Sequence, residues 1–404
     1  MSSVAPSADA EAKIQLPREV WSLIFGNAVI ALGYGVVAPV LPQLARHFGV
    51  SISAATFVIT AFAVMRLLAA PPAGLLVQRL GERRIYVTGV LIVALSTGAC
   101  ATSESYWQLL VYRALGGIGS TMFMVSALGL MIRISPHDAR GRVAGMFSGA
   151  FLIGSVFGPV LGAMTAGLGL RAPFLIYGGM LLVAATVVLV TLRSSPLADP
   201  APEDELAVTV RVALRHRAYR AALLSNFASG WSIFGLRFAL VPLFVVETFD
   251  RHPGIAGLAL TAFAVGNVVA VIPAGRLSDR IGRKPLLVVG LLLSAVSTAF
   301  LGTAPSLPLF LGEAAVAGLA SGIFNSPQQA SVADVLGKAR GGTAIAAFQM
   351  MADFGSIIGS FGVGVLAERF SFEWAFALSG LILLLAALGW MFAPETRDSP
   401  PVEA

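Results

Sequence analysis

The sequence predicts an all-α integral membrane protein with 12 transmembrane helices in two pseudo-symmetric six-helix bundles. Composition is the first reason: the chain is 57% hydrophobic and 12% charged, whereas a soluble domain carries about 25% charged residues. The second reason is that 12 apolar segments are each near the length that crosses the hydrocarbon core as a helix. The third is an internal repeat of about half the chain length, which indicates a duplicated half-protein.

The repeat is carried by a charged loop and by the apolar run before it. Gly74-Leu-Leu-Val-Gln-Arg-Leu-Gly-Glu-Arg-Arg recurs 201 residues later as Gly275-Arg-Leu-Ser-Asp-Arg-Ile-Gly-Arg-Lys-Pro. Upstream, the pentapeptide Thr60-Ala-Phe-Ala-Val recurs from Thr261. A period of this length is too long for a solenoid unit.

The expected helices follow from the apolar segments in order. They span 20–42, 54–78, 84–103, 106–132, 141–166, 172–193, 220–246, 255–277, 284–303, 307–334, 342–366 and 373–393. The corresponding organisation is a cytoplasmic tail at 1–19, a bundle at 20–193, a cytoplasmic linker at 194–219, a second bundle at 220–393 and a tail at 394–404. Both tails are polar enough to be disordered.

Loop charge predicts the orientation in the membrane. With both termini inside, cytoplasmic segments hold 20 of the 27 Lys and Arg residues, and outer loops hold 4. Positive charge is retained on the cytoplasmic side of membrane proteins. We therefore expect a multi-pass protein of the cell membrane with both termini in the cytoplasm.

The loop after Gly275 resembles the signature loop of the major facilitator superfamily, between its helices 8 and 9, and the loop after Gly74 resembles the equivalent loop between helices 2 and 3. The resemblance covers residues 18–394 and implies a transporter that works by alternating access. The residues that carry it are Gly74, Gln78, Gly81, Arg83, Gly275, Asp279, Arg280, Gly282, Arg283 and Lys284. In the family the loop acid lies near the N-terminus of a helix of the other half, where a negative charge is stabilised. Such an acid would keep the cytoplasmic side of the two halves closed. Asp279 can take this role, whereas Gln78 carries no charge. The alternative is that the loops only set topology.

Two further helices resemble family motifs. Arg113 lies in Tyr112-Arg-Ala-Leu-Gly-Gly, which resembles the helix 4 motif whose arginine is linked to proton transfer; the alternative is that Arg113 extends to the outer headgroups. Gly154, Gly158, Pro159 and Gly162 resemble the helix 5 motif of exporters, usually drug/proton antiporters. Ala163 stands where that motif usually has glycine. Glycines let helices approach closely, and proline bends a helix.

Charged residues inside the predicted helices are the candidates for proton coupling. Asp353 and Glu313 are the carboxylates that fall well inside helices, and Arg66, Arg113 and Arg237 are the cations. Such residues are costly in a bilayer and need a partner or a wet cavity. Arg66 and Asp353 share a depth on helices 2 and 11, which the family resemblance implies flank each other between the halves, so we expect an Arg66–Asp353 contact. Glu313, Arg237 and Arg113 also share a depth, and the resemblance implies that the helices of Glu313 and Arg237 line the central cavity, so we expect a cluster of the three. The alternative for both groups is a structural ion pair that makes packing specific.

Few polar residues remain to line a central cavity. The candidates are Asn27, Asn226, Trp231, Ser321, Asn325 and Gln328, although Trp231 also suits simple packing. A mostly apolar cavity suits amphipathic, drug-like molecules better than sugars, which need many aligned polar groups.

These observations together favour proton-coupled efflux of small amphipathic compounds, with the lipid bilayer and a small molecule as partners. A transporter of a specific metabolite and a non-transporting sensor on the same fold stay open. The sequence has no phosphate-binding loop, no histidine inside a predicted helix and one cysteine. We therefore expect no enzyme activity, no metal, no cofactor other than the proton as coupling ion, no nucleic acid partner, and a monomer.

Overall fold

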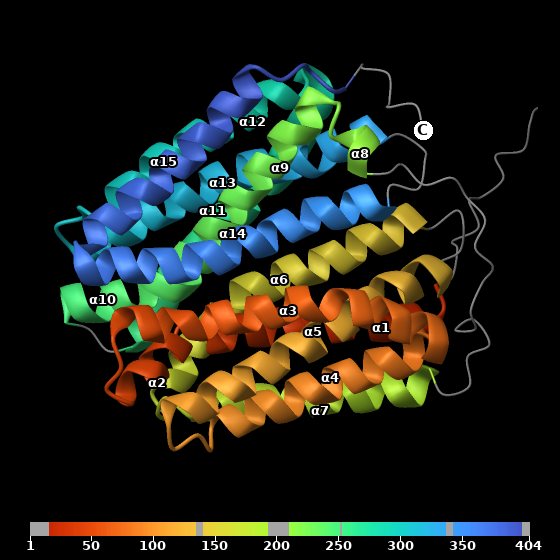
Figure 1. The fold of residues 1–404 in the computed structure, drawn as a ribbon, viewed down its shortest axis with the longest axis vertical. Helices are drawn as coiled ribbons and strands as arrows, with labels where there is room; N and C mark the ends of the chain where they lie inside the picture. Colours follow the sequence, from red (N-terminus) through yellow and green to blue (C-terminus); the bar gives the residue numbers. More distant parts are fainter. Residues whose placement is uncertain (1–15, 135–139, 193–209, 251–252, 337–341, 398–404) are drawn as a thin grey trace, which may run out of the picture.

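The computed structural model describes residues 16–134, 140–192, 210–250, 253–336 and 342–397, and helices dominate these ranges (Figure 1). The N-terminal bundle consists of α1 (Arg18–Val37), the short α2 (Leu41–His47), α3 (Ile52–Leu80), α4 (Glu82–Cys100), α5 (Tyr106–Ile134), α6 (Arg140–Ala166) and α7 (Ala172–Leu192). Residues 1–15 of the predicted tail at 1–19, most of the linker and the last seven residues lie outside the described ranges.

The C-terminal bundle begins with α8 (Val210–Ala213) and a continuous helical run made of α9 (Arg217–Gly230), the π-helical η3 (Trp231–Leu240) and α10 (Val241–Phe249). It continues with α11 (Pro253–Ile281), α12 (Arg283–Leu301), α13 (Leu307–Leu336), α14 (Gly342–Arg369) and α15 (Phe372–Met391). In the described part, 11 helices are long and apolar enough to cross a membrane, and the apolar stretch Gly149–Thr165 of α6 supplies a twelfth candidate.

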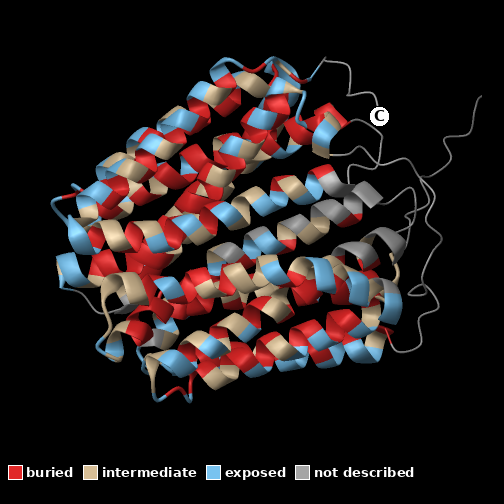
Figure 2. Ribbon diagram, viewed as in Figure 1, coloured by how far each residue is buried: buried red, intermediate tan, exposed pale blue. Residues whose placement is uncertain are grey.

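Burial agrees with a membrane setting. The side chains that face neighbouring helices are buried, whereas the outer faces of the helices expose large apolar side chains such as Leu95, Val190 and Phe300 (Figure 2). In water such a surface would be a liability. Lipid chains solvate it without penalty, so the exposed face is the one that meets the bilayer.

The two halves repeat their helix contacts as well as their sequence. In the N-terminal bundle, Asn27 of α1 donates from Nδ2 to the Phe147 carbonyl of α6 at 2.8 Å. In the C-terminal bundle, Asn226 of α9 donates to the Phe348 carbonyl of α14 at 2.5 Å. The two acceptors, Phe147 and Phe348, match in the repeat, and each is bonded by an asparagine of α1 or α9, so the duplication extends to how each bundle is held together.

The bundles meet along two helix pairs, α3 with α14 and α6 with α11. At the α2–α10 end, Gln43 donates to the Pro242 carbonyl at 2.6 Å, and Arg46 pairs with Glu247 at 3.2 Å. Nearby, the Ser53 N–H donates to Glu368 at 3.0 Å. These contacts fasten the two bundles at the α2–α10 end, which lies opposite the end where Gly81 and Gly282 join their helices (Figure 1). We call the latter the loop end.

The described residues after α15, 392–397, are anchored, whereas the tail at 394–404 is expected from the sequence to be disordered. The Glu395 carboxylate accepts hydrogen bonds from the Arg283 and Lys284 backbone N–H groups, at 2.8 and 3.0 Å, and so caps the N-terminus of α12. Gly282 precedes them with φ +101°, and a Cβ there would lie 2.4 Å from the Glu395 carboxylate. Glycine is therefore required at 282 both for its backbone conformation and for the approach of Glu395.

Replacing Glu395 by Gln is expected to lower the Tm of the purified protein by a degree or two at pH 7, because an anion at a helix N-terminus contributes about 0.3–1 kcal/mol. Partial burial raises the pKa of Glu395, but backbone N–H donors outweigh it and hold the pKa below its usual value. The stabilisation is therefore complete above about pH 4.3, the unfolded value, and is lost as pH falls through the lower folded pKa. Thermal unfolding of both proteins from pH 3 to 7 checks this; a Tm difference that persisted at pH 3 would contradict it.

Candidate functional site

An ion pair joins the two bundles at mid-depth. Arg66 of α3 and Asp353 of α14 lie with Nη2 3.2 Å from Oδ1, and the same nitrogen is 3.5 Å from Oδ2. The side chains keep 29% and 22% of their surface exposed. The structure thus brings together the pair that depth suggested, and partial exposure leaves the carboxylate reachable by water.

Arg113 lies inside the N-terminal bundle and does not extend to the membrane surface. Its side chain is 6% exposed, and its guanidinium carbon sits 4.5 Å from the centre of the Phe62 ring. Two small cavities are both lined by Tyr34, Arg113 and Tyr177. Arg113 therefore has the aromatic contact and the space that a buried guanidinium needs.

An aromatic cluster across the bundles surrounds this position. The Tyr34 ring of α1 packs against Phe62 at 6.5 Å and against Phe234 and Phe238 of the other bundle at 5.9 and 5.2 Å. These aromatics were absent from the predicted site. A signal was available: Phe62 lies in the repeated pentapeptide, and Phe234 and Phe238 share one helix face by their spacing.

The predicted cluster of Glu313, Arg237 and Arg113 is not formed. Arg237 of η3 stacks on Phe263 of α11, with its guanidinium carbon 3.4 Å from the ring centre. Glu313 of α13 has a buried Oε2 that lacks a hydrogen-bond partner in the described ranges. Arg113 belongs to the other bundle, so similar depth along the helices did not mean proximity.

Most of the predicted cavity residues lie between helices instead. Asn27 and Asn226 make the interhelical bonds described above, and Gln328 donates to Asn226 at 3.0 Å. Trp231 donates from Nε1 to Ser379 Oγ at 2.9 Å and packs against Gly359. Ser321 is also buried, whereas Asn325 stays partly exposed beside it. These polar groups stabilise helix contacts in this conformation. The two small cavities are lined instead by aromatic side chains such as Tyr34 and Tyr177.

The α6 glycines bring α1 and α6 into backbone contact. A Cβ at Gly158 would lie 2.4 Å from the Leu32 carbonyl oxygen, and one at Gly154 would lie 2.6 Å from the Ala31 Cβ. Gly162 likewise meets the Val36 carbonyl, and Pro159 continues the same helix next to Gly35. The motif residues therefore act through close packing of α6 on α1.

At the loop end, Asp279 pairs with Arg283 of its own loop, and among the described residues no ion pair links it to the other bundle. Arg283 also donates to Asp334 at 3.1 Å. Arg397 donates to the Arg280 carbonyl at 2.6 Å. In the first loop, Gly81 has φ +80°, a left-handed conformation that favours glycine. The Gln78 side chain lies outside the described residues.

Across the ranges that the structure describes, no group of three or more His, Cys, Asp or Glu residues could hold a metal ion.

Comparison with known proteins places these features in a family context. The model of the Major Facilitator Superfamily matches residues 23–250 and 222–404. Multidrug resistance protein 2 of Bacillus subtilis is 26% identical over 70% of this chain and 74% of its own length. Quinolone resistance protein NorA of Staphylococcus aureus is 29% identical over 60% of this chain and 63% of its own length, so that match spans less than two thirds of NorA. A bacterial homologue of the human lysosomal transporter Spinster, solved in an inward-facing and unoccupied conformation, matches 92% of this chain and 95% of its own with a TM-score of 0.78 and 16% identity.

Proposed function

Because the chain belongs to the Major Facilitator Superfamily, we propose that it exports small amphipathic compounds in exchange for protons, with Asp353 as the proton carrier. The observation that carries the proposal is the Arg66–Asp353 pair, which joins the two bundles and stays partly exposed. A buried or half-buried carboxylate between moving parts can load a proton in one conformation and release it in another.

The direction of transport rests on a second line of support. The α6 glycines resemble the helix 5 motif of exporters, and the relatives described above include proteins named for drug resistance. The positive-inside distribution of Lys and Arg favours a cytoplasmic loop end. In that orientation the contacts at the α2–α10 end fasten the bundles on the outer side, which supports an inward-facing conformation.

The proposed cycle follows from this arrangement. With Asp353 ionised, its attraction to Arg66 holds α3 against α14. Protonation removes the charge of Asp353 and weakens the pair, so the protonated form is stabilised when the bundles are separated at the α2–α10 end. Exchange then requires Asp353 to take up its proton from the outer side in that open state, and to release it to the cytoplasmic side after the end has closed and the pair with Arg66 has formed again.

The substrate class follows from the side chains around the ion pair. Tyr34, Phe62, Phe234 and Phe238 present apolar rings with one phenol group. Such a lining binds compounds with a flat apolar body and offers few of the aligned hydrogen bonds that a sugar needs.

Inverted membrane vesicles with an acidic lumen test this function. Amphipathic compounds that are exported should release protons from the lumen, followed by dequenching of a pH-sensitive dye. The Glu373→Gln protein is the matched control, because Glu373 is an exposed acid at the start of α15. Compound-dependent proton release from both proteins supports the proposal; its absence across the panel, with folded protein present, would contradict it.

A further inference from the structure

We propose that Arg237 binds the negatively charged group of an aromatic amphipathic substrate, and that Arg113 is the equivalent cation of the other bundle. This inference deepens the transport function proposed above and rests on it. On this inference the transporter prefers substrates with a carboxylate or sulfonate group over cations, and each bundle contains one arginine that recognises the negative charge.

Arg237 is a buried cation that has no counter-ion within the part of the chain that the structure describes. Its side chain lies in η3 and is 4% exposed. Nη1 and Nη2 are both buried without a hydrogen-bond partner among the described residues. Stacking on Phe263 offsets only part of the desolvation of a guanidinium. Unused N–H donors of arginine form a planar fork that matches a carboxylate or sulfonate, so an anion would complete the site.

The other bundle contains an equivalent arrangement. Phe263 is the repeat counterpart of Phe62, and Phe62 carries the guanidinium of Arg113. The two arginines come from different helices, α5 and η3, because the α13 position that matches Arg113 is Ala314. In each bundle a guanidinium therefore stacks on the equivalent phenylalanine, although the two arginines are not equivalent in the repeat. Simple inheritance of packing from a duplicated ancestor does not explain two non-equivalent arginines on equivalent rings.

The surroundings favour an anion over a cation. Asp353 is already neutralised by Arg66. Arg113 retains a buried Nε without a partner in the described part of the chain. Tyr34 packs against Phe62, which carries Arg113, and against Phe234 and Phe238 of η3, the helix that carries Arg237. Phe238 also lines one of the cavities that Arg113 lines. A substrate with an aromatic body and an acidic group would place the body on these rings and the charge toward a guanidinium.

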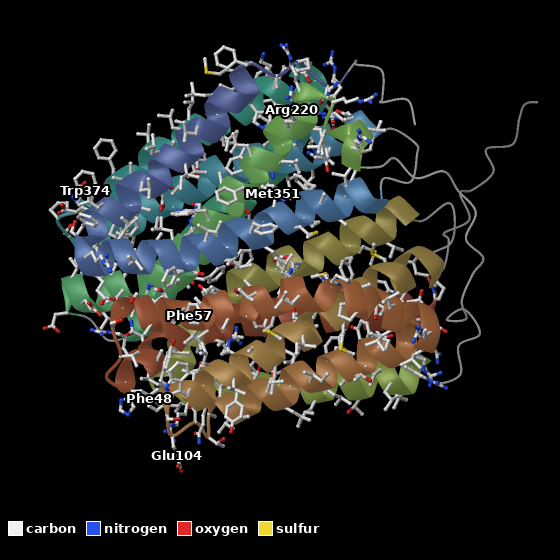
Figure 3. The ribbon with its side chains drawn as sticks, viewed as in Figure 1. Phe48, Phe57, Glu104, Arg220, Met351 and Trp374 are labelled. Carbon is white, nitrogen blue, oxygen red and sulfur yellow. The ribbon has the colours of Figure 1, made fainter. Side chains whose placement is uncertain are left out.

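Stability gives a test that needs no transport. Replacing Arg237 by Met removes the unpaired charge and keeps an apolar contact with Phe263. We expect the Tm of the purified, ligand-free protein to rise by about 3 °C. Arg220→Met is the matched control, since Arg220 is exposed at the loop end of α9 (Figure 3), and its Tm should move by less than about 1 °C. A marked fall in the Tm of Arg237→Met would show a structural role and overturn the proposal.

Ligand binding gives the second test, with 1-naphthalenesulfonate and the neutral 1-naphthalenemethanol as probes. The sulfonate should raise the Tm of the wild type at concentrations about tenfold below those at which the alcohol does. Arg237→Met and Arg113→Met should each lose most of that preference, whereas Arg220→Met should keep it. Equal effects of the two probes on the wild type, or an unchanged preference in Arg237→Met, would overturn the proposal.

The vesicle assay separates this inference from the function on which it rests. Export of neutral or cationic compounds without any sulfonate preference in the Tm assay would leave the proposed efflux standing and remove the anion site. A sulfonate preference that depends on Arg237, in a protein that moves no compound, would support the site and remove the proposed efflux.

Discussion

Asp353→Asn is expected to reduce proton-coupled transport to the background of protein-free vesicles while the protein still folds. The amide cannot carry a proton through the cycle, and it leaves Arg66 without the negative partner that it contacts at 3.2 Å. Loss of a half-buried partner destabilises by about 1–3 kcal/mol, which a protein of this size tolerates. Compound-dependent proton release from vesicles, normalised to the amount of folded protein, checks the result.

A charge swap distinguishes coupling from packing. The double variant Arg66→Asp/Asp353→Arg restores opposite charges between α3 and α14. If the pair only fastened the helices, the swap would recover transport that each single variant lacks. Coupling by Asp353 predicts that the swap recovers stability but not pH-driven transport.

Gly158→Val is expected to prevent α6 from seating on α1 and to leave little monodisperse protein after extraction in mild detergent. The added side chain would begin 2.4 Å from the Leu32 carbonyl oxygen and 2.7 Å from the Gly35 Cα. These are backbone atoms, so relief requires the two helices to move apart, and overpacking of this kind costs about 1–3 kcal/mol or more. Size-exclusion chromatography and thermal unfolding measure the outcome.

The matched control is Gly98→Ala in α4. Nothing lies within 4 Å of a Cβ built at Gly98, and alanine favours a helix more than glycine does. We expect wild-type yield and an equal or slightly higher Tm. Normal yield and Tm of Gly158→Val would show that the close approach of α1 and α6 is not needed for folding.

Length, hydropathy and the repeat were sufficient to predict the helices, because these features depend on local sequence. Each of the 12 predicted segments overlaps a helix or, for 220–246, the run from α9 to α10. The local sequence does not indicate that the middle of this run, η3, is a π-helix. We attribute the π-helix to packing on α14, where Trp231 lies against Gly359.

The site was predictable only where depth along a helix was decisive. Arg66 and Asp353 lie at mid-depth on helices that the family resemblance implied to be neighbours, so depth along each helix was then enough to predict their contact. Asn27, Asn226 and Gln328 show the limit: sequence gave their depth but not the direction in which each helix faces. Arg237 adds a second limit, since the ring on which a long side chain stacks depends on the whole bundle.

Alternating access controlled by Asp353 can be tested with two spin labels at the α2–α10 end. Labels on Cys introduced at the exposed positions His47 and Thr248 report the separation of α2 and α10, with the buried Cys100 replaced by Ser. Pulsed electron spin resonance of the wild type at neutral pH should give a short distance. Asp353→Asn, or the wild type at acidic pH, should add a second, longer population. Identical distance distributions in the two proteins at every pH would contradict control of the α2–α10 end by Asp353.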